Sequence, residues 1–263
     1  LRYGRVLIFT DQDVDGSHIK GLVINMFHNL WPEILELNNF IISLATPIVK
    51  VFKKKSKIDF YTLGEFESWK EKNDIKGWRT KYYKGLGTST SKEAKEYFTD
   101  FEKKKIEYIY SKDIENEKKE KINKCEEALH LAFIKENTDK RKDWLKKYDK
   151  EEVIEQTEKK VSYRDFINKD LIHFSNYDCE RSIACICDGL KPSLRKILYS
   201  VFKRNLKNEI KVAQLAGYVS EHAAYHHGEN SLYECIIGMA QNFVGSNNIE
   251  LLEPIGQFGT RLQ

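Results

Sequence analysis

The stretch that decides the fold is Val6-Leu7-Ile8-Phe9-Thr10-Asp11-Gln12-Asp13-Val14-Asp15-Gly16-Ser17-His18. Its first five residues are apolar or β-branched, and a short apolar run before a polar turn predicts a strand inside a sheet. Three aspartates follow at the carboxyl end of that strand, which is where open α/β sheets bind their ligands. Period-two spacing predicts that Asp11, Asp13 and Asp15 point to the same side while the chain stays extended. Gly16 is expected to permit a sharp turn into the next helix.

The three carboxylates favour a hard cation. They would repel one another unless a cation neutralised them, and oxygen ligands without Cys or His favour Mg²⁺, Mn²⁺ or Ca²⁺ over zinc. An EF-hand loop also begins D-x-D-x-D-G, but its twelfth position needs a bidentate Glu, and here that position is Leu22. The alternative that these residues alone leave open is a solvated acidic turn, because Asp and Gly both favour turns.

Composition is typical of a globular protein with free thiols. The 263 residues suggest about two domains, and 41% hydrophobic residues suffice for their cores. Lys+Arg 44 against Asp+Glu 40 gives a net charge of +4, which permits nucleic-acid binding without requiring it. The five cysteines form no C-x-x-C pair, which fits a reducing compartment. No apolar run approaches the roughly 20 residues of a membrane span, so we expect no membrane partner.

The first 110 residues are expected to form an α/β domain. Apolar residues recur at helical spacing from His18 to Leu37, which predicts a helix packed on the sheet, with Pro32 kinking or restarting it. Strands are expected at 40–45, 48–52 and 78–83. Thr90 and Glu93 have the spacing of a capping box that opens another helix.

The second half is more charged and then turns helical. Residues 92–160 mix Lys with acids, which is typical of solvated helical faces. From Tyr163 onward, helices are predicted before a turn near 189, from Pro192, at 211–222, and after Ser231, which is expected to cap the last one. Two helices joined by a tight Gly-containing turn form a helix-turn-helix candidate. Residues 245–248 and 256–259 flank Leu251-Leu252 as a β-wing would.

Longer strings carry a resemblance. The string from Leu1-Arg2-Tyr3-Gly4 to Leu22 resembles the acidic segment of the TOPRIM domain in type II DNA topoisomerases of the eukaryotic kind. Tyr82-Tyr83-Lys84-Gly85-Leu86-Gly87-Thr88-Ser89 resembles their loop toward the ATPase gate, and Glu221-His222-Ala223-Ala224-Tyr225-His226-His227-Gly228-Glu229 resembles their winged-helix turn that faces the scissile phosphate. Only the stretch from Lys118 to Lys124 looks like an insertion against the family pattern.

The resemblance implies a fold with three parts. Residues 1–110 would be the C-terminal part of a Rossmann-like TOPRIM portion with a parallel sheet, together with its associated region. Residues 111–163 would be a charged helical connector, and residues 164–263 a mainly α winged-helix DNA-binding domain.

The resemblance also implies the site residues. Asp11, Asp13 and Asp15 would hold Mg²⁺, for which Mn²⁺ or Ca²⁺ could substitute in binding, and Lys84 would couple the ATP state to cleavage. DNA contacts would come from Arg141, Lys142, Lys191, Tyr225, His227 and Ser231. His227 would in addition support the proton transfer or the transition state.

The implied activity is that of an ATP-dependent enzyme that cleaves both strands of DNA transiently, passes a second duplex through the break and religates it. Double-stranded DNA and a second copy in a homodimer would be its partners, ATP would bind outside these residues, and the nucleus, or the cytoplasm for a viral protein, would be its compartment. The family's nucleophilic Tyr, preceded by Arg, is expected beyond Gln263, and a metal-binding Glu before Leu1. We therefore expect an internal fragment that is inactive alone. The alternatives are a TOPRIM primase or nuclease and a non-catalytic DNA-binding relic.

Overall fold

The computed structural model divides the chain into two compact units, Leu1–Tyr177 and Asp178–Gln263. It describes residues 1–54, 56–61, 63–83, 89–99, 101–110, 114–115, 121–155, 158–225, 227–247 and 249–262. The sequence predicted boundaries after residues 110 and 163, whereas this division falls after Tyr177. The reason is that helices between residues 124 and 171 contribute to the hydrophobic core of the first unit.

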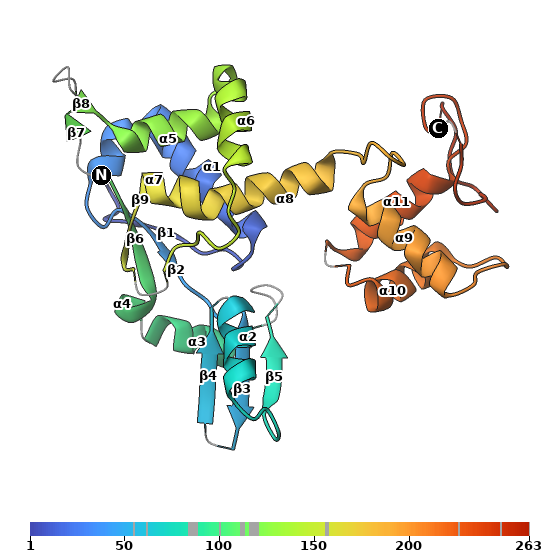
Figure 1. Ribbon diagram of the computed structural model, residues 1–263, viewed down its shortest axis with the longest axis horizontal. Helices are drawn as coiled ribbons and strands as arrows, with labels where there is room; N and C mark the ends of the chain where they lie inside the picture. The colour runs from blue at the N-terminus through green and yellow to red at the C-terminus, as the bar shows by residue number, and fades with distance from the viewer. Residues whose placement is uncertain are drawn as a thin grey trace. The chain divides into compact units, whose positions relative to one another are not determined.

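A four-stranded mixed sheet lies at the centre of the first unit, in the order β1-β2-β6-β9 (Figure 1). Its strands are β1 (Val6–Ile8), β2 (Ile41–Leu44), β6 (Lys105–Ile109) and β9 (Lys160–Ser162). The pairs β1–β2 and β6–β9 are parallel, as predicted, but β2 and β6 are antiparallel, with Leu44 opposite Lys105. The prediction of a parallel sheet is therefore wrong for this one pairing. Because the chain leaves the sheet after Leu44 and returns at the same end at Lys105, the two strands run in opposite directions.

Helix α1 (Val14–Leu30) begins earlier than the predicted start at His18, and it ends before Pro32, which opens the 3-10 helix η1 (Pro32–Glu36). Its buried face is narrow and includes small residues. A Cβ on Gly21 would lie 3.2 Å from side-chain atoms of both Leu171 and Phe133, so the missing side chain lets α1 pack closely against the later helices.

The prediction that the apolar residues of α1 pack on the sheet holds for only some of them. Leu22, Met26 and Leu30 are about half exposed, while Ile24 is fully buried in the core. The buried face contains small and polar residues that periodicity alone assigned no role.

The remaining helices of this unit come from the second half of its sequence. They are α5 (Lys124–Phe133), the 3-10 helix η3 (Lys135–Asn137), α6 (Thr138–Lys146), α7 (Tyr163–Phe166), the π-helix η4 (Ile167–Leu171) and α8 (Ile172–Ser182), which crosses the unit boundary. Leu129 and Phe166 are fully buried in the core. Trp144 donates from Nε1 to Asn168 Oδ1 at 2.9 Å and packs against the core, which anchors α6 to it.

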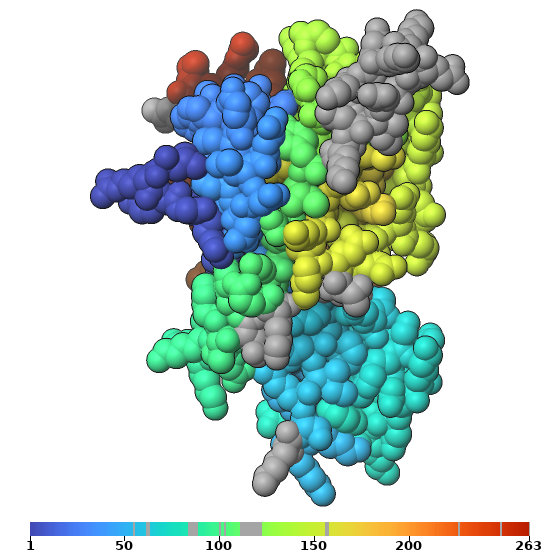
Figure 2. All heavy atoms as spheres, turned by 90° about the vertical axis from the view of Figure 1, so that its left-hand side faces the viewer, coloured from blue at the N-terminus to red at the C-terminus, as the bar shows by residue number. Residues whose placement is uncertain are grey.

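A three-stranded antiparallel module is inserted between β2 and β6. Its order is β4-β3-β5, with β3 (Val49–Lys53), β4 (Ser56–Phe60) and β5 (Arg79–Tyr82), and it is followed by α3 (Ser91–Thr99) and α4 (Phe101–Lys104). Helix α2 (Leu63–Lys72) contributes Phe66 and Trp69 to the module's own small aromatic core. The module forms a distinct lobe, coloured cyan in Figure 2.

A short hairpin precedes α5. It consists of β7 (Ile114–Glu115) and β8 (Lys121–Ile122), paired antiparallel. Residues 118–120 of the predicted insertion lie outside the described residues.

The second unit is built from α9 (Pro192–Lys203), α10 (Val212–His222) and α11 (Glu229–Ala240) around a core that includes Ile197 and Leu232. Pro192 begins α9, as predicted. The predicted cap at Ser231 is wrong, because α11 begins at Glu229 after Gly228, whose φ of 86° suits a residue without a Cβ.

The predicted β-wing has no strand among the described residues after α11. Instead, the backbone N–H groups of Leu251 and Leu252 donate to Met239 O at 3.2 and 3.4 Å, and Leu252 packs against the helical core. Their backbone hydrogen bonds thus go to the end of α11 rather than to a second strand. In the described part of the chain, no helix is long and apolar enough to cross a membrane.

Candidate metal centre and nucleic-acid interface

The acidic loop, Asp11–Asp15, comprises the end of the connection from β1 and the first two residues of α1. Asp13 is the N-cap residue of α1, with extended backbone angles, and its Oδ1 accepts from the Gly16 N–H at 2.7 Å. Asp15 lies inside the first helical turn. The expectation that all three aspartates share an extended stretch is therefore wrong at Asp15, because the cap ends the extended backbone at Asp13. Acidic side chains suit this position, since a helix N-terminus carries partial positive charge.

Gly16 is required for a reason other than the predicted turn. Its backbone is helical, but a Cβ on it would lie 2.0 Å from the carbonyl oxygen of Asp11. Thr10 also approaches, since its Oγ1 donates to Gly16 O at 3.3 Å. Any larger side chain would push the acidic loop away from the start of α1.

The donor chemistry of the loop fits Mg²⁺, because carboxylate oxygens are its preferred protein ligands. Among the described residues, however, no three His, Cys, Asp or Glu side chains gather in a group that could hold a metal ion. Mg²⁺ usually keeps several waters and takes only one or two carboxylates plus substrate phosphates. The loop therefore fits an open site better than a closed cage.

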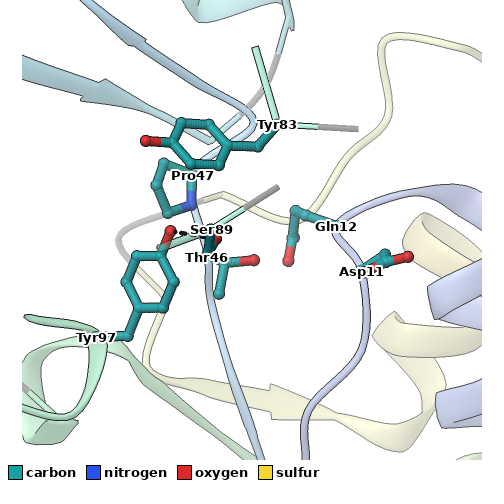
Figure 3. A pocket seen from close by; sticks show the side chains of 7 residues that line it. All are labelled: Asp11, Gln12, Thr46, Pro47, Tyr83, Ser89 and Tyr97. Carbon is teal, nitrogen blue, oxygen red and sulfur yellow. Dashed lines mark hydrogen bonds between the residues drawn. The ribbon is translucent and has the colours of Figure 1, made fainter. Parts of the chain in front are cut away.

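A shallow pocket lies beside the acidic loop. Figure 3 shows Asp11 and Gln12 on one side and Thr46, Pro47, Tyr83, Ser89 and Tyr97 on the other. The hydroxyls of Ser89 and Tyr97 are 3.0 Å apart and share a hydrogen bond. Gln12 extends toward these hydroxyl groups, whereas the Asp11 side chain points away from them (Figure 3).

Glu93 contacts described residues on either side of residues 84–88, which lie outside the described part of the chain. It accepts from Lys81 Nζ at 2.8 Å, from the Tyr83 hydroxyl and from Thr90 N at 2.8 Å, which confirms the predicted capping box. Burial would raise the pKa of Glu93, but these hydrogen bonds outweigh it and lower that pKa to about 2. Lys84, the predicted coupling residue, lies outside the described residues.

Arg141 and Lys142 differ sharply in their surroundings. The Arg141 guanidinium donates to Leu131 O at 3.1 Å and also to Ile134 O, so it caps the C-terminal end of α5. The Lys142 side chain is exposed and pairs with Asp139 at 2.8 Å. Lys142 is therefore the more accessible of the two for a phosphate.

The predicted DNA contacts of the second unit also differ. Lys191 is the exposed N-cap residue of α9, and His227 and Ser231 are exposed. Tyr225 is only 7% exposed, packs in the helical core, and has its ring 5.5 Å from that of His227. A ring buried in this way holds the turn in place.

A buried polar cluster under the acidic loop was not predicted. Lys20 is 8% exposed on the core face of α1, and its Nζ lies 3.0 Å from Asp170 Oδ2. Burial by itself lowers the pKa of Lys20, but electrostatic interactions with Tyr108 and Asp170 and the hydrogen bond to Asp170 raise it above its ordinary value. The available signal was spacing, because Lys20 lies four residues from both Gly16 and Ile24 on the same helical face.

Comparison with known proteins identifies the family. A family model described as the C-terminal associated domain of TOPRIM matches residues 44–179, and one for the A-type chain of DNA gyrase/topoisomerase IV matches residues 181–263. A probable DNA topoisomerase 2 from Dictyostelium discoideum is 57% identical over the whole chain. The chain belongs to the type II DNA topoisomerase family. The predicted family is thus confirmed.

Other relatives support the same family assignment. Human DNA topoisomerase 2-alpha is 52% identical and is aligned with 100% of the chain. The chain spans 17% of the length of both the human and the Dictyostelium relatives. The crystal structure of the Plasmodium falciparum topoisomerase II DNA-binding, cleavage and re-ligation domain superposes with a TM-score of 0.80 at 52% identity, covering 98% of this chain and 34% of that one.

Proposed function

We propose that the full-length protein is an ATP-dependent type II DNA topoisomerase, which changes DNA topology by transient double-strand cleavage, strand passage and religation. The observation that carries this proposal is the acidic loop at the end of β1, in a chain whose residues 44–179 and 181–263 match the two family models. A TOPRIM nuclease or primase would share the acidic loop, but the second match, to the gyrase/topoisomerase IV family, favours the topoisomerase.

The finer fold assignment belongs to the same proposal. The parallel pair β1–β2, joined through α1, supports a Rossmann-like TOPRIM portion. The three packed helices α9, α10 and α11 support a winged-helix domain. The described residues after α11 contain no strand, so this assignment rests on the three helices.

The metal assignment rests on the acidic loop. Of Asp11, Asp13 and Asp15, one or two carboxylates at a time would hold Mg²⁺, or Mn²⁺ or Ca²⁺ in its place, and water and substrate phosphate would complete the open site. When bound, such a cation supplies positive charge that stabilises phosphate oxygens in the transition state. Asp13 both offers a carboxylate and fixes the start of α1, and Gly16 lets Asp11 stay close to that start.

The DNA contacts divide into two kinds. The first kind consists of exposed side chains that would contact the DNA backbone directly: Lys142, Lys191, His227 and Ser231. His227 would also support proton transfer. Arg141 and Tyr225 would act mainly by holding their segments in place. A basic segment supports DNA binding: residues 191–211 carry Lys191, Arg195, Lys196, Lys203, Arg204, Lys207 and Lys211 against one acid, Glu209. Most of these side chains are exposed, while Lys196 is partly buried and Arg195 pairs with Asp188 just outside the segment.

The remaining parts of the proposal concern the whole protein. ATP would bind outside these residues, and Lys84 would couple its state to cleavage. The protein would work as a homodimer on double-stranded DNA, in the nucleus or, for a viral protein, in the cytoplasm. The family membership supports each of these.

The decisive experiment for the activity uses Asp13→Asn in the full-length protein. Asn keeps the N-cap hydrogen bond but removes the negative charge, so we expect Mg²⁺-dependent relaxation and covalent cleavage complexes to be lost while DNA binding and folding remain. The matched control is Asp74→Asn, an exposed aspartate whose Oδ1 also accepts a backbone N–H. Full cleavage by Asp13→Asn would disprove the metal assignment. If the wild-type protein leaves broken DNA ends with no protein covalently attached, that result would favour the nuclease.

A second experiment separates the two kinds of DNA contact. Lys142→Ala and Lys191→Ala should weaken binding to all DNA sequences alike, and each should reduce the slope of log K against log[salt] by about one. Arg141→Ala should instead lower the free energy of unfolding with little change in that slope, because its guanidinium is bonded to carbonyls. An unchanged slope in the Lys142→Ala/Lys191→Ala variant would place both lysines on a merely solvated face.

A further inference from the structure

The buried cluster below the acidic loop joins residues far apart in the sequence. Lys20 Nζ lies 3.0 Å from Asp170 Oδ2, and the Ser17 hydroxyl donates to Asp170 Oδ1 at 2.6 Å. Both oxygens of a single carboxylate are thus used by the first two turns of α1. Because Lys20 is 8% exposed, water can do little to replace these contacts.

Asp170 is presented by an unusual backbone. It lies in η4 (Ile167–Leu171), a π-helical stretch between α7 and α8. One-turn π-helical segments are rare within α-helices and are frequent at functional sites. The neighbouring Leu171 contacts α1 at the position where Gly21 lacks a Cβ, so the π-helix and α1 meet closely at this level.

The same cluster reaches the acidic loop through Ser17. The Ser17 N–H donates to Asp13 O at 3.2 Å, and its hydroxyl lies 3.4 Å from the same oxygen. Asp13 in turn caps α1 through Gly16 N. A continuous set of contacts therefore runs from Asp170 through Ser17 to the backbone of the central aspartate of the loop.

The cluster also places a fixed positive charge near the loop. The carboxylate of Asp13 acts electrostatically on Lys20, which lies seven residues further along α1. The ammonium group is balanced by Asp170 and is held where it can offset part of the repulsion among the loop aspartates. Its position depends on α1 and η4 together.

We propose that Lys20 and Asp170 are positioning residues that hold the first turns of α1, and with them the Asp11–Asp15 loop, in the geometry that takes up a divalent cation. This inference rests on the proposed metal-dependent cleavage. Residues that orient metal ligands without touching the metal change metal affinity by about 10–100-fold when they are replaced.

The test uses the double variant Lys20→Met/Asp170→Leu in the full-length protein. Replacing both charges by apolar side chains removes the clamp without leaving either charge buried and unpaired, an exchange that is often neutral for stability. We expect the Mg²⁺ concentration for half-maximal DNA cleavage to rise about tenfold, while cleavage at saturating Mg²⁺ largely recovers. If the Lys20–Asp170 pair were purely structural, a double variant as stable as the wild type would need the same Mg²⁺ concentration for half-maximal cleavage as the wild type.

A second readout requires neither metal nor activity. Without divalent cations, hydrogen exchange at the Gly16 and Ser17 amides should be faster in the double variant, while exchange in the sheet stays as in the wild type. The matched control is Lys169→Met, which removes an adjacent lysine on the same π-helix that pairs with Asp165 at 3.5 Å near the surface. Lys169→Met should change neither the Mg²⁺ concentration for half-maximal cleavage nor the exchange rates of the Gly16 and Ser17 amides.

The outcomes separate the inference from the proposed function. Wild-type Mg²⁺ dependence together with wild-type exchange in the folded double variant would overturn the inference. If that variant fails to fold, Ser17→Ala decides, because it removes only one hydroxyl and should shift both readouts in the same direction to a smaller extent; no shift overturns the inference. If the wild-type protein does not cleave DNA, the proposed function fails, and the exchange measurement still tests whether the clamp holds the loop.

Discussion

Among the described residues of the first unit, Lys20 and Lys50 are the buried lysines, and their surroundings act on them in opposite ways. Lys20, under the central sheet's acidic loop, is 8% exposed and has Asp170 Oδ2 at 3.0 Å. Lys50, in the inserted module, is 1% exposed, and its nearest carboxylate, that of Asp59, is 4.0 Å away. Lys50 is thus more fully buried than Lys20, but its ion pair is longer by the two distances given.

The pKa values of the two lysines follow from this difference. Burial lowers the pKa of both, but for Lys20 the interactions with Tyr108 and Asp170 outweigh it, whereas for Lys50 burial prevails over Asp59. The rings of Tyr83 and Tyr97, at 5.4 and 4.9 Å from Lys50 Nζ, offer only cation–π attraction. A buried lysine therefore needs a directly hydrogen-bonded carboxylate to remain firmly charged.

The largest expected effect is that of Lys20→Met alone. This change leaves the Asp170 carboxylate in a largely buried place without its cation, which costs roughly 3 kcal/mol. Urea unfolding of the protein at pH 7 measures this cost. A loss below about 1 kcal/mol, as for exposed ion pairs, would show that the Lys20–Asp170 pair is no stronger than a surface contact.

The next effect concerns Glu93, which accepts hydrogen bonds from Lys81, Tyr83 and Thr90. Its pKa in the folded state is about 2, below the ordinary 4.5, so its stabilisation is present above pH 4.5 and is lost as the pH falls toward 2. It amounts to on the order of 2 kcal/mol. Urea midpoints measured between pH 7 and pH 2 should fall less steeply for Glu93→Gln than for the wild type. Parallel curves would contradict the assigned role of its hydrogen bonds.

The smallest effect is that of Lys50→Met. Because burial already disfavours its charge, we expect a change of less than about 1 kcal/mol at pH 7, of either sign. Its folded pKa lies below the ordinary 10.5, so the unfolded chain binds more protons and the wild type should gain stability as the pH rises toward 10.5. The variant should lack this gain. Equal responses of the two proteins between pH 8 and 10.5 would remove the contrast with Lys20.

Much of the local structure could be predicted from spacing in the sequence. The strand β1, the start of α9 at Pro192 and the Thr90–Glu93 capping box formed as expected. For the helix start and the capping box, the partners are within a few residues of one another, so their geometry is fixed as soon as the helix forms. The strand was predictable from its apolar run, although it pairs with β2 some way along the chain. The family could be predicted in the same way, because its motifs are continuous strings.

The sequence by itself thus determined the strand, the acidic loop, the helix starts and the family. Only the tertiary structure decided that β6 runs antiparallel to β2, that Arg141 caps α5, that Tyr225 is buried and that Lys20 meets Asp170. The Lys20–Asp170 contact joins residues 150 positions apart. No local spacing encodes such a contact, because it depends on how closely α1 and the π-helix pack and on which side chains the core excludes from water.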